Sequence, residues 1–297
     1  MTTPRRIVAG VAIVVGLAGV VAFGIGLREA FAVRKDTAVT AIGSAHIERL
    51  LGPRDFAALG SPVGRDLGVT RGGAIVFRAG AVLRVVDPAR APLPEINAIA
   101  LSAVPESFAL DPSGTMLTVA GGYFGMLTQD GELVQGIPLP SPDVDLAPSV
   151  HEGATYLFGK TGAHHRLYRF IDDGTLQVLL ESGEPIIAAA DNETAMFAAT
   201  GSAILRIQAG TPETLFTAPG DFAGPIRSLA VTADGIVLFA TDARVYALLG
   251  PNALSIVNDA GGSIRVQDGA LYVLDPARQL LFSLRPASAQ LFAEVSR

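Results

Sequence analysis

The feature that most constrains this chain is a pattern of short apolar runs that repeats about every 40 residues from residue 67 onward. Each copy has a short run, a turn and a second, strongly apolar run, and the clearest copy lies in residues 264–286. Short runs joined by Gly-containing turns predict antiparallel strands. The turn positions are 41, 39, 40, 42 and 34 residues apart, at Gly73, Gly114, Gly153, Glu193, Gly235 and Gly269.

Each repeat also contains a third apolar run and a weaker fourth one. The third runs include residues 82–86 and 245–249, and the fourth runs include 132–139 and 176–181. Four short strands in a unit of about 40 residues are typical of a propeller blade. A β-sandwich, the alternative all-β fold, would not require so constant a step. We therefore predict an all-β fold, a six-bladed β-propeller preceded by one N-terminal transmembrane helix.

Three segments carry a resemblance to known propellers. They are Leu-Tyr-Val-Leu-Asp-Pro at 271–276, Phe-Ala-Leu-Asp-Pro-Ser-Gly-Thr-Met-Leu-Thr-Val at 108–119 and Leu-Ala-Val-Thr-Ala-Asp-Gly-Ile-Val-Leu-Phe-Ala at 229–240. From residue 67 to its end the chain resembles six-bladed propellers of the NHL, SMP-30-like and WD40-like superfamily. The chain has no Trp, so it lacks the Trp-Asp dipeptide of WD40 blades. The resemblance implies an architecture and leaves the family open.

The N-terminus contains an uncharged apolar run, residues 7–27, which follows Arg5 and Arg6. A helix of this length can cross the apolar core of a bilayer. A cleaved signal peptide is the alternative, with Ala30-Phe31-Ala32 as its small-residue cleavage site. The length of the run favours an uncleaved anchor. We expect a single-pass bacterial membrane protein with its propeller on the periplasmic or extracellular side.

These patterns divide the chain into three parts. Residues 1–36 form the tail and the anchor or signal peptide, residues 37–66 a connector, and residues 67–297 the propeller. Within the connector, residues 38–42 fit a strand, whereas a wider apolar spacing from Val39 to Leu51 fits a helix. Gly52-Pro53 ends either element.

Composition excludes several kinds of function. The net charge of −6, without a basic cluster, argues against nucleic acid as a partner. The chain has no Cys, so thiol catalysis and thiolate metal sites are impossible. The sequence also lacks a Gly-x-Ser-x-Gly elbow and an HExxH motif. We expect no cofactor and no catalytic or metal-ligating residues.

Candidate binding residues lie where a propeller gathers its loops. The loops before each first strand and after each second strand share one rim, whereas the Asp-Gly turns lie on the other rim and shape the backbone. The loop-rich rim includes residues 141–145, 159–165, 220–224, 241–242 and 275–278. Its polar candidates are Asp143, Asp145, Asp221, Arg227 and Asp242.

The resemblance to SMP-30-like propellers implies a possible lactonase activity, since those enzymes hold a divalent cation with Glu, Asn and Asp. The four Asn residues do not fit that arrangement: Asn192 falls in a turn between strands, and Asn97 falls in an outer strand. The sequence leaves the enzyme question undecided and favours a binding role. We therefore expect a membrane-anchored binding or scaffold module with a protein partner, such as an accessory subunit of an envelope or membrane complex. The alternative is a cation-dependent lactonase or hydrolase.

Overall fold

The structure is a computed structural model that describes most of the body of the chain. The described residues are 40–42, 45–60, 62–87, 95–100, 107–110, 114–128, 132–147, 155–171, 175–192, 194–220, 222, 224–250 and 253–285. The expected anchor at 7–27 and the signal-peptide alternative at 30–32 lie outside them. Among the residues described, no helix is both long enough and apolar enough to cross a membrane.

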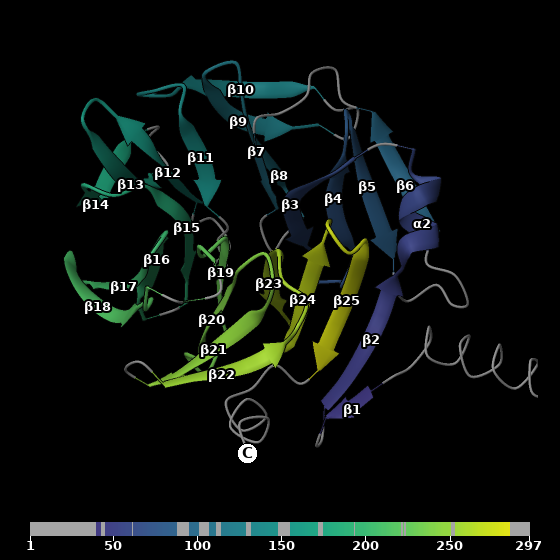
Figure 1. Ribbon diagram of the computed structural model, residues 1–297. Coiled ribbons are helices and arrows are strands. Elements are labelled where there is room, and N and C mark those ends of the chain that lie inside the picture. The colour runs from purple at the N-terminus through teal and green to yellow at the C-terminus, as the bar shows by residue number, and fades with distance from the viewer. Residues whose placement is uncertain are drawn as a thin grey trace, which may run out of the picture. The chain divides into compact units, whose positions relative to one another are not determined.

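The described strands form six antiparallel sheets, each with one strand innermost and the others stacked outward (Figure 1); five sheets have four strands and the last has five. The innermost strands of neighbouring sheets contact one another in an unbroken ring, which closes where β23 meets β3. The prediction of an all-β, six-bladed propeller is therefore confirmed. The innermost strands are β3 (Val63–Val69), β7 (Ser107–Leu110), β11 (Val144–Ala147), β15 (Ile186–Asp191), β19 (Ser228–Val231) and β23 (Ser263–Gln267).

The second and third strands of the sheets match the second and third apolar runs of the repeat. The second strands are β4 (Ile75–Ala79), β8 (Met116–Ala120), β12 (Thr155–Thr161), β16 (Met196–Thr200), β20 (Val237–Ala240) and β24 (Ala270–Asp275). The third strands are β5 (Val82–Asp87), β9 (Tyr123–Leu127), β13 (His164–Phe170), β17 (Ala203–Gln208), β21 (Val245–Gly250) and β25 (Leu280–Arg285).

The outermost strands are more polar and more exposed than the inner ones. Every residue of β16, β20 and β24 is buried, whereas most residues of the outermost strand of the fourth sheet are exposed. The inner strands are apolar on both faces because neighbouring sheets cover both faces. The fourth strands from the centre are β6 (Glu95–Ala100), β10 (Leu133–Pro138), β14 (Leu176–Ser182), β18 (Thr211–Thr217), β22 (Ala253–Asn258) and, in the last sheet, β2 (Ala45–Leu51).

The turns between first and second strands explain why the repeat carries a glycine. In the first and fifth sheets the glycine has a positive φ, +82° at Gly73 and +88° at Gly235. Its N–H donates to the carbonyl of the threonine three residues earlier, Thr70 or Thr232, at 2.9 Å. Such a φ suits glycine because it has no Cβ. The fourth sheet uses Asn192 instead, whose side-chain oxygen accepts the N–H groups of the turn.

The last sheet is completed by a strand from the other end of the chain. β2 pairs antiparallel with β25, with Ile47 opposite Leu284. The short strand β1 (Thr40–Ile42) follows at the edge of this sheet, and helix α2 (Pro53–Ala58) follows β2. Residues 45–51, which the sequence analysis places in the connector, thus form part of the propeller. Leu51 is 1% exposed and packs in a cluster with Phe77 and Tyr272.

Shortening Leu51 to alanine should lower the free energy of unfolding by about 2–5 kcal/mol, because it leaves a cavity at the ring closure. Urea denaturation of the wild type and of Leu51→Ala measures this loss. The control is Val178→Ala on β14, where the side chain is 48% exposed and a change of about 0.5 kcal/mol or less is expected. If both variants unfold like the wild type, β2 does not close the ring in solution.

Candidate functional site

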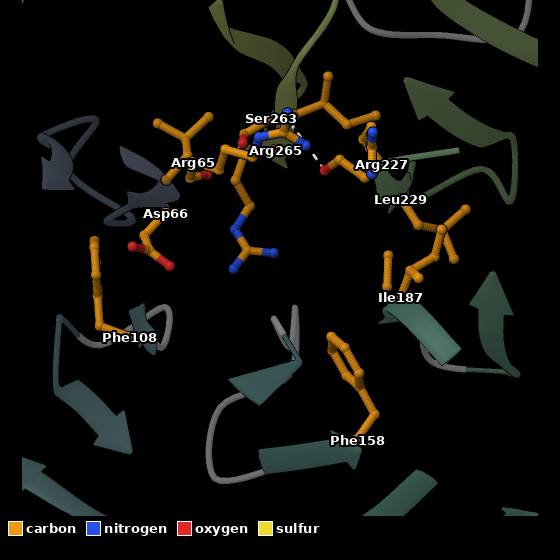
Figure 2. Close-up of a pocket in the computed structure, with 13 residues that line it drawn as sticks. Arg65, Asp66, Phe108, Phe158, Ile187, Arg227, Leu229, Ser263 and Arg265 are labelled. Atoms are coloured by element: carbon orange, nitrogen blue, oxygen red, sulfur yellow. Dashed lines mark hydrogen bonds between the residues drawn. The ribbon is translucent and has the colours of Figure 1, made fainter. Parts of the chain in front are cut away.

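A pocket of about 140 Å³ opens at the rim where the innermost strands begin. Its walls come from the early residues of β3, β15 and β23, from Phe108 of β7, from Phe158 of β12, and from Arg227 to Leu229 at β19 (Figure 2). Five of the six innermost strands therefore surround it. This is the loop-rich rim on which the sequence analysis places its candidate residues.

An ion-paired cluster lies at the mouth of the pocket. Asp242, in the turn between β20 and β21, accepts Arg227 Nε on Oδ2 at 3.1 Å and lies 3.0 Å from Arg65 Nη2 through Oδ1. All three side chains are substantially exposed, between 39% and 58%. Exposed pairs of this kind contribute about 0–1 kcal/mol each to stability. The cluster therefore contributes little to the stability of the fold. Its main effect is to hold charged groups in place around the mouth of the pocket.

Asp66 brings a second carboxylate to the pocket. Its Oδ2 accepts Arg78 Nε at 2.9 Å, and the backbone N–H of Phe108 in the next sheet also donates to its carboxylate. Burial raises the pKa of Asp66 above its ordinary value, although Arg78 and the N–H groups act in the opposite direction. Asp66 thus links β3 to both β4 and β7, and its carboxylate already accepts hydrogen bonds from these two strands.

Arg265 on β23 is the buried cation of the site. Its side chain extends into the middle of the pocket (Figure 2), and the residue is only 8% exposed. Burial lowers the pKa of Arg265 to about 10, and the attraction of the Asp191 carboxylate opposes this shift. Because 10 is still far above neutrality, the guanidinium stays charged under physiological conditions.

Asp191, at the end of β15, is buried together with Tyr156 of β12. The Tyr156 hydroxyl and the Asp191 carboxylate are hydrogen-bonded. Burial raises the pKa of Tyr156, and the charge and hydrogen bond of Asp191 raise it further, while Arg169 acts in the opposite direction. The phenol is therefore neutral, and the charge of Asp191 also acts on Arg265.

The structure brings together two of the five candidate residues. Arg227 and Asp242 form an ion pair at the pocket mouth. Asp143 and Asp145 are exposed at the start of β11, and neither lines the pocket. Asp221 lies outside the described residues. A binding role for these residues stays a prediction.

Three charged residues of the site were missed by sequence reasoning. Arg65 and Asp66 fall in the stretch read as a connector, although β3 begins at Val63. Arg265 stands between Ile264 and Val266 in an apolar run. The sequence signal that could have identified Arg265 as a site residue is a single arginine inside an otherwise apolar innermost strand.

The donor set around the pocket suits an anion better than a cation. Within the described ranges, no three His, Asp or Glu side chains gather as a metal site would require. Asn192 shapes a turn, and Asn97 lies on the outermost strand β6, as the sequence predicted. The guanidinium of Arg265 also disfavours a metal site, because its positive charge repels a divalent cation placed beside it.

The comparisons with known proteins identify the architecture. No protein-family profile and no curated protein matches the sequence. A gluconolactonase from Xanthomonas campestris is similar in structure, with a TM-score of 0.61 and 15% identity over 82% of this chain and 90% of its own. The calcium-binding protein regucalcin from Agrobacterium tumefaciens has a TM-score of 0.56 and 14% identity over 76% of this chain and 90% of its own.

Virginiamycin B lyase from Staphylococcus aureus is a third neighbour, with a TM-score of 0.52 and 14% identity over 73% of this chain and 78% of its own. At such identities the likeness shows the fold alone. The resemblance to the six-bladed propeller superfamily is confirmed at that level, and the family within it stays unresolved.

The buried Tyr156 should make stability depend on alkaline pH. Its folded-state pKa is raised, so its contribution is present below the unfolded value of about 10 and is lost as the pH rises toward the folded value. Between pH 8 and pH 11 the wild type should lose more unfolding free energy than Tyr156→Phe, measured by urea denaturation. An equal loss in both proteins would contradict the buried, neutral phenol.

Proposed function

We propose that this chain is a membrane-tethered binding module whose propeller lies outside the cytoplasm and holds a protein partner on the loop-rich rim. It acts as a scaffold or accessory subunit and catalyses no reaction of its own. The observation that carries this function is the exposed charge cluster of Arg65, Arg227 and Asp242 around the pocket mouth.

Charge on this rim extends beyond the pocket mouth. Arg244, after the turn that holds Asp242, pairs with Asp259 at 3.0 Å, and Asp259 is 84% exposed. Both signs of charge therefore occur along the rim of the fifth sheet and at Arg65 of the first sheet. Such a pattern favours recognition of a protein surface with complementary charges, because misplaced like charges reject other partners.

The tether is supported by the sequence. Residues 7–27 contain no charged side chain, and about 20 apolar residues suffice for a membrane-spanning helix. Anchoring would confine the rim near membrane-bound partners and raise their effective concentration.

Reversing one charge at the rim should remove the partner. In Asp242→Arg the carboxylate shared by Arg65 and Arg227 becomes a third cation, so the full-length protein extracted in detergent should lose its stoichiometric partner in quantitative affinity purification. The matched control is Glu213→Arg on β18, another exposed acid paired with an arginine, Arg206. Retention of the partner by Asp242→Arg, or its loss from both variants, would overturn the rim as the docking surface.

A charge in the centre of the apolar run should weaken membrane anchoring. Leu17→Arg costs about 2.5–3.5 kcal/mol of insertion free energy, so carbonate extraction should release more of this variant than of the wild type. Intact mass of the membrane-bound wild type should retain residues 1–32. A protein that begins after Ala32 would show that the segment is a cleaved signal peptide, and the tether would then be wrong.

A further inference from the structure

We propose that the rim pocket is a binding site for a small organic carboxylate, with the ligand oxygens accepting N–H groups of Arg265 and its carbon chain lying on the apolar walls. Such a ligand would occupy the channel itself. The observations that support it are those of the pocket and of Arg265, and they require no protein partner on the rim.

The first reason is the state of the Arg265 guanidinium. It carries five N–H donors and is buried within the ring. In the part of the chain that the structure describes, no hydrogen bond joins it to another side chain, and Asp191 is the charge that acts on it. A buried cation whose donors lack acceptors is costly unless a ligand or water satisfies them.

The second reason is that the neighbouring carboxylates do not satisfy the donors of Arg265. Asp191 is hydrogen-bonded with Tyr156, and its Oδ2 is buried and accepts no hydrogen bond from the residues described, so Asp191 acts on Arg265 through its charge. Asp66 accepts both Arg78 and the backbone N–H of Phe108. The donors of Arg265 that face the pocket are thus left for an acceptor brought from outside.

The third reason is the shape and lining of the pocket. Its volume of about 140 Å³ is several times the roughly 10–15 Å³ that one water molecule needs on the same measure, which is enough for an organic acid of a few carbon atoms. The walls opposite Arg265 are apolar, and they include Phe108, Phe158, Ile187 and Leu229 (Figure 2). A planar guanidinium matches a carboxylate through two parallel hydrogen bonds, while the apolar walls suit its carbon chain.

The balance of charge also favours an anion. Arg65, Arg227 and Arg265 line the pocket, and Asp66 is the one acid that lines it among the residues that the structure describes. Asp242 offsets part of the positive charge at the mouth. The remaining positive field should draw anions toward the pocket and weaken as salt rises.

Isothermal titration of the full-length protein in detergent tests this site with butanoate, butan-1-ol and butylammonium, which have equal chain length, and with inorganic phosphate as a fourth probe. We expect saturable binding of butanoate, weakened by added salt, and at least about tenfold weaker binding of butan-1-ol and butylammonium, because a hydrogen bond to a charged group is lost. Equal binding of butan-1-ol, or binding of inorganic phosphate but not of butanoate, would overturn the carboxylate site. These comparisons use the wild type and need no variant.

Substitutions then locate the site. Arg265→Met should weaken butanoate binding about tenfold or more, and Arg265→Lys should weaken it less, since it keeps the charge but not the planar fork. The control is Arg206→Met on β17, whose side chain is 40% exposed, and it should bind butanoate like the wild type. Unchanged binding by a folded Arg265→Met would place the ligand elsewhere and overturn the proposal.

Discussion

The constraint on which the whole structure depends is that each sheet has two apolar faces to cover. β16, β20 and β24 are buried along their whole length, so none of their sheets is stable in isolation. Clusters of buried side chains accordingly join one sheet to the next, as Val237, Phe239 and Phe197 do between the fourth and fifth sheets. Closing six sheets into a ring covers every inner face at once. The pocket is the space that remains where the innermost strands converge.

The arrangement of charges follows from this geometry. Side chains at the rim, such as Asp242 and Arg227, remain in water and make weak, adjustable ion pairs. Side chains on the strands inside the ring lose their hydration and need dedicated partners, which Asp66 finds in Arg78 and Asp191 finds in Tyr156. Rim and channel thus offer two kinds of recognition, one suited to a broad charged surface and one suited to a small polar head group.

The fold could be predicted from the sequence because its signals are local. The apolar runs and the turn glycines at Gly73 and Gly235 lie within a few residues of the strands they define. The closing strand β2 could not be predicted, since its partner β25 is at the other end of the chain. The same limit applies to the site: loop position suggested Arg227 and Asp242, but only the assembled ring shows that Arg265 points into a shared space.

The pairing of β2 with β25 also sets an order of events during synthesis. Ile47 is among the first residues of the propeller to leave the ribosome, and Leu284, which it faces, is among the last. Until then the last sheet has no outer strand, and the edge of β25 and the matching edge of β2 are both unpaired. Contacts of such long sequence separation form slowly. The newborn protein therefore passes through a stage in which its two free edges are open to pairing with another copy, and rapid completion of the C-terminal sheet protects it from self-association.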